Sequence, residues 1–165
     1  MNMKNLTRTI CLTLVILLGS LMTGCGADFN KGTRAMDSGD FKTALRHLKP
    51  LARQGHFKAQ NNLGLMYKKG LGVPQDYKTA VKWYTLAAEQ GHANAQYNLG
   101  NMYHNGRGVP QNYVYAYMWG DIANVNENQN GTELRNIAAK KMTAAQIAKA
   151  QELASECVRK EYKGC

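Results

Sequence analysis

The chain has 165 residues and a formal net charge of +10, with 21 Lys and Arg residues against 11 Asp and Glu residues. This length suits one domain of ordinary size. The basic residues form no cluster along the sequence, which argues against a nucleic-acid partner.

The first segment resembles a secretory signal peptide. Lys4 and Arg8 form a small basic region, and residues 10–22 are almost wholly apolar. An apolar run of this length is too short to span a bilayer as a helix, but it is typical of the apolar region of a signal peptide. We therefore expect residues 1–24 to be a signal peptide, with residue 27 as the alternative end.

The end of this segment allows two processing routes. Residues 22–25 (Met-Thr-Gly-Cys) resemble a lipobox, in which Cys25 becomes the lipidated first residue. The residue after Cys25 is Gly26, and an acidic residue at that place would direct the lipoprotein away from the outer membrane. This route therefore predicts an outer-membrane lipoprotein facing the periplasm. In the alternative route, Cys25 and Ala27 form a signal-peptidase site, and Asp28 starts a soluble periplasmic or secreted protein. The Gly-Cys pair that closes the apolar run favours the lipobox slightly.

A repeat of 36 residues organises the chain after the signal. The matched segments include 62–67 with 98–103 (Asn-Leu-Gly-x-Met-Tyr), 72–75 with 108–111 (Gly-Val-Pro-Gln), and 40–44 with 76–80. A fixed period of this size is typical of repeat architectures. We divide the chain into a degenerate repeat at 28–56, repeats at 57–92 and 93–126, and a loop with capping helices at 127–165.

Each repeat predicts two helices joined by a loop that contains glycine and proline. In the first clear repeat we expect helices at 57–69 and from 77 to about 90. The second helix of each repeat follows a good N-cap residue, whose side chain can accept from free N–H groups of the first turn: Asp40, Asp76 and Asn112. Two of these helices precede a glycine suited to the left-handed position after a helix, Gly55 and Gly91.

Two matched glycines, Gly64 and Gly100, lie inside predicted first helices. Glycine costs about 0.5–1 kcal/mol relative to alanine within a helix. A repeated position that accepts this cost predicts that a neighbouring helix approaches closely. We expect the opposing surfaces to be small side chains, namely Ala59, Ala80, Ala87 and Ala88.

The repeat pattern ends after Ala123. Residues 124–131 are rich in asparagine and predict a loop, and a short helix is expected after Thr132. Thr143 and Gln146 match a capping box at the start of a last helix. That helix has one apolar face and is expected to cover the exposed core at the end of the repeats.

Two cysteines, Cys157 and Cys165, remain after the signal segment and Cys25 are set aside. In an oxidising compartment an even pair favours a disulfide. Two free thiols are the alternative. Metal binding is a weaker interpretation, because no histidine or second cysteine pair accompanies them.

The repeated motifs Asn-Leu-Gly-x-Met-Tyr, Gly-x-Gly-Val-Pro-Gln and Tyr-x-x-Ala-x-x-Trp resemble Sel-1-like repeats (SLR), relatives of tetratricopeptide repeats. The resemblance covers about residues 28–126. It implies an all-α fold, an α-solenoid of stacked helix hairpins, and a family function that is mainly the binding of other proteins. Several exported members resemble envelope lipoproteins or regulators of polysaccharide assembly. A cysteine-rich branch resembles proteins proposed to act on β-lactams, but neither clear repeat here contains a cysteine.

The sequence shows no catalytic residue set, metal site or cofactor motif. His56 and His92 recur at one repeat position and are expected to be structural, and His104 has no acidic partner at a helical offset. Ser38 and Ser155 are the serines that remain after the signal, and neither lies in a nucleophile elbow.

Candidate contact residues lie on the first helices, which line the inner groove of a solenoid. Asn62 and Asn98 are matched, and their amides can hydrogen-bond an extended peptide backbone or groups within the repeat. Asn101 and His104 differ from their counterparts in the preceding repeat, as specificity positions do.

We therefore predict a monomeric, non-catalytic scaffold of the bacterial cell envelope that binds a protein or peptide in the solenoid groove. One alternative is a β-lactam-binding or hydrolytic SLR protein. Another is a basic anchor for anionic envelope polymer or lipid headgroups. Without Lys4 and Arg8 the net charge is +8, because 19 basic residues stand against 11 acidic ones.

Overall fold

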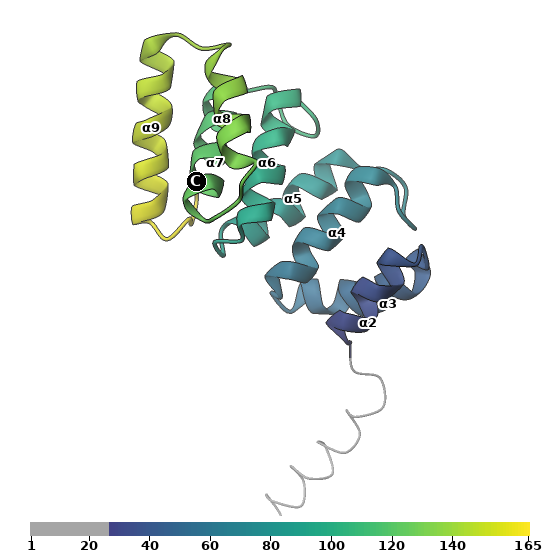
Figure 1. Cartoon of the computed structure of the whole chain (residues 1–165). Coiled ribbons are helices and arrows are strands. Elements are labelled where there is room, and N and C mark those ends of the chain that lie inside the picture. The colour runs from purple at the N-terminus through teal and green to yellow at the C-terminus, as the bar shows by residue number, and fades with distance from the viewer. Residues whose placement is uncertain (1–26) are drawn as a thin grey trace, which may run out of the picture.

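The computed structural model describes residues 27–165, and it confirms the all-α solenoid over that range. Figure 1 shows the helices following one another from the N-terminal to the C-terminal end. They are α2 (Phe29–Asp37), α3 (Phe41–Arg53), α4 (Phe57–Lys69), α5 (Tyr77–Ala88), α6 (Ala93–Asn105), α7 (Tyr113–Val125), α8 (Gly131–Ala139) and α9 (Ala144–Arg159). The predicted signal peptide and Cys25 lie outside the described residues. Within them, no helix is long and apolar enough to cross a membrane.

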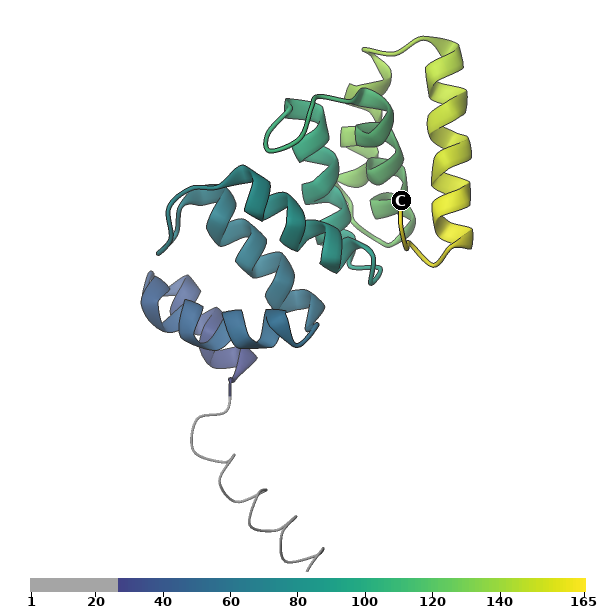
Figure 2. The same ribbon diagram turned by 180° about the vertical axis from the view of Figure 1, so that it is seen from behind.

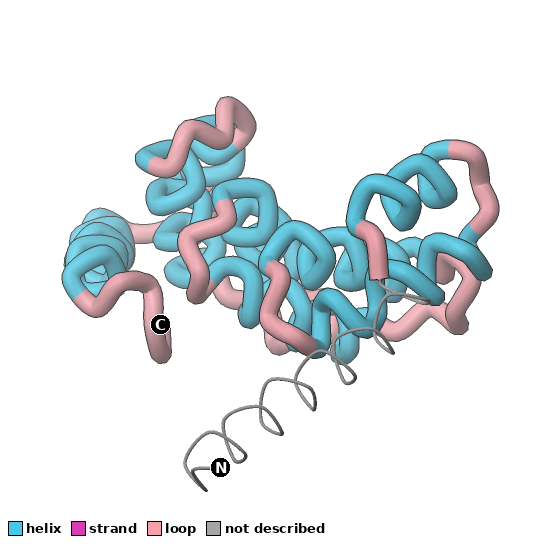
Figure 3. Tube along the Cα trace, turned by 90° about the horizontal axis from the view of Figure 1, so that it is seen from below, coloured by secondary structure: helices cyan, strands magenta, loops and turns pink. Residues whose placement is uncertain are grey.

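The helices pair into hairpins that stack in chain order. α2 packs on α3, α4 on α5, and α6 on α7, and the second helix of each hairpin also packs on the next first helix. Loops join the helices at their ends (Figure 3). α8 packs on α7 as the first helix of a fourth hairpin would. α9, however, packs on α7 instead of pairing with α8. The yellow α9 therefore lies outermost at the C-terminal end (Figure 2).

The predicted caps are present at the second helices. In each of the three, the cap oxygen accepts from the backbone N–H three residues further on, at 3.0–3.1 Å: Asp40, Asp76 and Asn112. The glycines after α3 and α5 have positive φ angles of 93° at Gly55 and 79° at Gly91. Because these caps are local contacts, sequence pattern alone places them correctly.

The first hairpin is degenerate because its connection is four residues shorter. Gly32 precedes Asp40 by eight residues, whereas Gly64 precedes Asp76 by twelve. Gly32 nevertheless has the same role as Gly64. A Cβ atom at Gly32 would lie 2.8 Å from the side chain of Leu48 on the paired helix. Both positions therefore need glycine for close helix packing.

The close approach at the helical glycines is present, but the predicted opposing surface is wrong. A Cβ atom at Gly64 would lie 2.7 Å from the ring of Tyr84, and one at Gly100 would lie 2.7 Å from Leu134 Cδ2 and 3.2 Å from Trp119 Cβ. Large side chains thus occupy the space that glycine leaves. The four alanines expected there are fully buried within the cores instead: Ala59, Ala80, Ala87 and Ala88.

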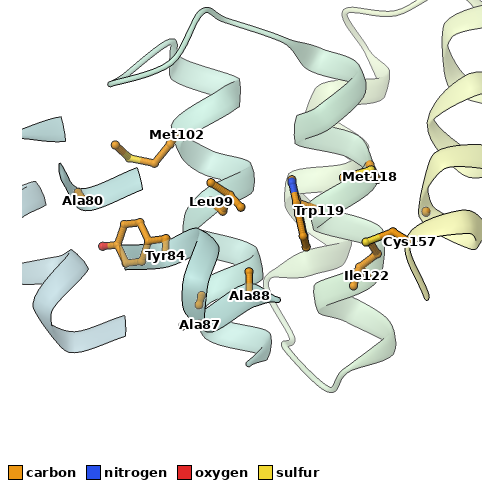
Figure 4. Close-up of a cluster of buried hydrophobic side chains, with 12 residues drawn as sticks. Ala80, Tyr84, Ala87, Ala88, Leu99, Met102, Met118, Trp119, Ile122 and Cys157 are labelled. Atoms are coloured by element: carbon orange, nitrogen blue, oxygen red, sulfur yellow. The ribbon is translucent and has the colours of Figure 1, made fainter. Parts of the chain in front are cut away.

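The largest core lies between α5, α6, α7 and α9 (Figure 4). Tyr84, Leu99 and Trp119 are buried in it, and Cys157 of α9 packs against the same cluster. The expectation that the last helix covers the end of the repeats is therefore confirmed. Thr143 and Gln146 form the predicted capping box at its start.

The C-terminus folds back after α9. The Sγ atoms of Cys157 and Cys165 lie at disulfide distance, with their Cα atoms 5.5 Å apart. Cys157 is buried against α7, so this pair fixes the terminal residues beside the capping helix.

Candidate functional site

Side-chain amides form a stripe along one face of α6. Asn94, Asn98, Asn101 and Asn105 are spaced four, three and four residues apart, which places them on one side of a helix. We call these four residues the asparagine stripe. Asn98 and Asn101, two of the predicted contact residues, are half-buried, whereas the two end residues are exposed.

The donor atoms of three stripe residues are used within the protein. Nδ2 of Asn98 donates to Oδ1 of Asn61 on α4, and Nδ2 of Asn101 donates to the backbone oxygen of Tyr97, each at 3.1 Å. Nδ2 of Asn105 donates to the backbone oxygen of Asn101 at 2.8 Å. Within residues 27–165, the Oδ1 atoms of these three residues have no hydrogen-bond donor. Three stripe residues therefore keep an Oδ1 acceptor without a donor, whereas Oδ1 of Asn94 accepts from Nδ2 of Asn128 at 2.7 Å.

The other two predicted contact residues flank the stripe. Asn62 follows Asn61 on α4, and Asn61 is the residue that bonds to Asn98 of α6. The half-buried Asn62 side chain makes no hydrogen bond within the described residues. The ring of His104 packs edge-on against Tyr113 with centroids 5.5 Å apart, and its buried Nδ1 has no partner in the described chain.

The bond between Asn98 and Asn61 also joins two successive repeats. The alternative expectation is a hydrogen bond within the repeat, whereas the bond of Asn98 crosses to the preceding repeat. Asn98 thus has a structural role through Nδ2 and an open acceptor through Oδ1.

Two buried glutamines fix the relative positions of the hairpins, and our interpretation of the sequence missed them. Nε2 of Gln60 donates to the backbone oxygen of Ala52 at 3.1 Å, and Nε2 of Gln96 donates to that of Ala88 at 3.2 Å. Each Oε1 accepts from the amide that follows its own hairpin, Gln90 or Asn126. The available signal was the recurrence of glutamine at the 36-residue offset.

Positive charge gathers next to the C-terminal ends of α4 and α6. Burial lowers the pKa of the half-buried Lys68, and the nearby charges of Arg107 and Lys69 lower it further. Arg107 lies over the ring of Tyr77, 5.6 Å from its centroid. None of the ion pairs within residues 27–165 involves these three cations. The region is therefore electropositive.

The other histidines contact neighbouring structural groups. Nδ1 of His56 caps α4 by accepting from Ala59 N–H at 3.2 Å, and its ring stacks on Phe29. His47 Nδ1 accepts from Asp28 N–H at 3.2 Å. Burial lowers the pKa of His92, and the charge of Lys58 contributes in the same direction.

The cavity between α7 and α9 holds no arrangement suited to nucleophilic catalysis. It has a volume of about 340 Å³ and apolar walls that include Val125 and Val158. Its acid, Asp121, pairs with Arg135 at 3.0 Å. The hydroxyl of Ser155 donates to a backbone oxygen of its own helix. Within the described residues, no group of three or more His, Cys, Asp or Glu side chains can hold a metal ion.

Two solved structures are similar to this chain. One is a protective antigen present in uropathogenic Escherichia coli strains that displays an SLR fold, with 36% sequence identity and a TM-score of 0.76. The alignment covers 81% of this chain and 30% of that chain. The other is a Sel1 repeat protein from Oxalobacter formigenes, with 34% identity and a TM-score of 0.63, covering 66% of this chain and 44% of that chain. This chain thus spans less than half of either protein.

A comparison with curated proteins gives no match. The Sel1 repeat family matches in three consecutive segments, residues 29–56, 57–92 and 93–123. These segments cover more than half of the chain and coincide with the three stacked hairpins. Sel1 repeat proteins are generally scaffolds for protein interaction, and most are not catalytic. The chain belongs to the Sel1 repeat family.

Proposed function

We propose that this protein is a non-catalytic scaffold of the bacterial cell envelope that binds a protein or peptide along the first helices α4 and α6. The observation that carries the proposal is the asparagine stripe, in which Asn98, Asn101 and Asn105 donate through Nδ2 and keep Oδ1 without a donor. Backbone N–H groups of an extended peptide are suitable donors for these acceptors. Asn62, Asn98, Asn101 and His104 are the proposed contact residues.

The proposed envelope location is supported by the sequence before the first helix. Lys4, Arg8 and the apolar run at 10–22 support export, and Gly24-Cys25 supports lipidation and an outer-membrane position. Labelling of cells with a palmitate analogue tests this part. Absence of label, together with a mature chain that starts at Asp28, would instead support a soluble periplasmic or secreted protein.

Site-specific photo-cross-linking in intact cells tests the binding surface. A photoreactive residue at Asn101 is expected to give a discrete adduct, whereas one at Lys82 on the exposed side of α5 is expected to give none of that size. Asn98→Ala should reduce adduct formation from position 101, because it removes an acceptor and the bond to α4. Asn136→Ala, an exposed asparagine on α8, is the matched control.

Adducts of equal yield at positions 101 and 82 would contradict binding at the stripe. A different outcome would favour an enzyme. If the purified protein hydrolysed a β-lactam or a peptidoglycan fragment, and a single substitution abolished that activity, the non-catalytic proposal would be wrong.

A further inference from the structure

Four basic side chains run along the outward side of α3. They are spaced four, three and four residues apart, which places them on one face of the helix: Lys42, Arg46, Lys49 and Arg53. All four are exposed, and Ala44, Leu48 and Ala52 are buried on the inward side. Charges that are dispersed in the sequence are thus gathered on one face by the helix.

α5 continues this arrangement in the next repeat. Lys78 and Lys82 are exposed and occupy the repeat positions of Lys42 and Arg46. We call these six residues of α3 and α5 the basic face. Neither helix contains an acidic residue, and none of the six takes part in an ion pair within residues 27–165. The cap carboxylates Asp40 and Asp76 lie near enough to feel the charges of Lys42, Arg46 and Lys82, but two carboxylates against six cations leave the basic face with a net positive charge.

The third repeat shows that this helix side can receive another structure. On α7 the corresponding positions include Val114, Met118 and Val125, and Met118 is only 1% exposed. α9 packs on α7 and covers part of that face. At the positions of Val114 and Met118 the first two repeats carry basic residues, so these positions suit an anionic occupant instead of an apolar helix. At the position of Val125 the first repeat carries Arg53 and the second carries Glu89.

The chain enters the fold against α3, the helix that carries four of the six basic residues. Asp28 N–H donates to Nδ1 of His47 on α3, so the start of α2 lies against α3. Figure 1 shows α2 and α3 together at the N-terminal end. Cys25 is three residues before Asp28, and three residues span at most about 11 Å. A helix with its side chains is about 10 Å across, so a lipid at Cys25 would hold this hairpin at a membrane surface.

We propose that the basic face of α3 and α5 docks on the anionic headgroups of a phospholipid bilayer. Basic side chains next to a membrane attachment point bind anionic lipid, and an acyl anchor combined with a basic patch is a common pair of membrane signals. If Cys25 is lipidated as proposed above, the nearness of α3 to the start of the described chain favours a bilayer over a soluble envelope polymer. The inference rests on the proposed lipidation at Cys25 for its choice of a bilayer, but it does not depend on binding at the asparagine stripe.

Lysine acetylation footprinting of the full chain, purified from the envelope, tests the docking. The protein is added to vesicles of phosphatidylcholine alone or to vesicles in which about one third of the lipid is phosphatidylglycerol. Acetylation of each lysine is then measured by mass spectrometry. Because the readout is local, it reports orientation even if a lipid anchor holds the chain on both vesicles. We expect acetylation of the four lysines of the basic face to slow by about fivefold, the factor for one bound charge, only on the anionic vesicles. These lysines are Lys42, Lys49, Lys78 and Lys82.

Lys140 and Lys141, exposed after α8, are the internal control and should react equally on both vesicles. The protection should fall as salt rises, because exposed charges are screened within about 8 Å at physiological ionic strength. Replacing Lys42 and Lys49 by Gln should weaken the salt-sensitive component by about fivefold per charge, whereas the Lys140→Gln and Lys141→Gln pair should not. Circular dichroism melts verify that each variant is folded.

Three outcomes would overturn the proposal. Equal acetylation on both vesicles would exclude docking through the basic face. Slowing that includes Lys140 and Lys141 to the same extent would indicate general shielding. If a soluble polyanion of matched charge slowed acetylation of the basic face and the anionic vesicles did not, the face would be assigned to envelope polymer instead.

Discussion

α5 and α7 occupy the same place in successive repeats, but their outward sides have opposite surroundings. Lys82 on α5 is exposed to solvent, whereas Met118, 36 residues later, is buried under α9. The two residues occupy the same repeat position, so the chemistry of the side chain decides whether this side of the helix is covered or exposed to solvent. Where the face is apolar, the capping helix docks. Where it is basic, burial would cost the hydration of charged groups, and the face remains open.

This difference also explains where the solenoid stops. α8 packs on α7 as a new first helix would, yet α9 does not complete a hairpin with it. α9 instead contacts the apolar outward side of α7, where Ala154 and Cys157 join the core of α5, α6 and α7. A fourth hairpin of the same kind is therefore replaced by a cap that covers the last repeat from outside.

The largest expected effect is a difference in stability between variants at the same repeat position of α7 and α5. Met118→Ala removes buried atoms beneath α9 and should lower the free energy of unfolding by about 2–5 kcal/mol. Lys82→Ala, at the same repeat position on α5, should change it by no more than about 0.5 kcal/mol. Urea unfolding followed by circular dichroism measures both. Equal effects would show that α9 does not cover α7 in solution.

The cysteine pair tests how the cap is held. A Cys157–Cys165 disulfide closes a short C-terminal loop, for which the chain-entropy model gives about 2.5 kcal/mol of stabilisation. Reductant should therefore lower the melting temperature of the protein. Intact mass under non-reducing conditions is the direct measurement. Two free thiols in protein purified from the periplasm would contradict the bridge.

Gly100→Leu tests the close helix contact in the third hairpin. A Cβ atom there would lie 2.7 Å from Leu134 of α8, so the larger side chain should cost about 1–3 kcal/mol. Asn105→Leu, at an exposed position on the same helix, is the control. If the two variants melted at the same temperature, the approach of α8 to α6 would not be as close as the structure shows.

The smallest expected effect is the weakening of helix N-caps in acid. It should differ between the aspartate caps of α3 and α5 and the asparagine cap of α7. The hydroxyl and backbone N–H of Thr79 lower the pKa of Asp76, and the backbone N–H of Thr43 lowers that of Asp40. A lowered folded-state pKa gives stabilisation that is present above the unfolded-state pKa and is lost as pH falls through the folded value. Asn112 makes the equivalent bond on α7 without titrating.

Amide hydrogen exchange, corrected for its intrinsic pH dependence, measures this difference. Protection at the amides of Thr43 and Thr79 should decrease in acid, whereas protection at Tyr115, which is bonded to Asn112, should not. A parallel loss at all three amides would indicate global acid unfolding instead of cap titration.

The candidate site was only partly predictable from the sequence. The matched amides of Asn62 and Asn98 pointed to the first helices as the candidate binding surface. The role of each amide atom, however, depends on partners in other repeats. Oδ1 of Asn61, which accepts from Asn98, is 37 residues away in the chain. The buried bonds of Gln60 and Gln96 likewise reach other helices, so helical periodicity alone cannot assign them.

The sequence by itself determined the repeat length, the helices and their caps, because these depend on residues within a few positions of each other. Asp76 caps α5 through Thr79, and no distant contact is required. Tertiary structure decided that Tyr84, and not an alanine, lies over Gly64, and that α9 packs on α7 instead of α8. Those outcomes depend on the volumes and polarity of side chains that meet only when the helices stack.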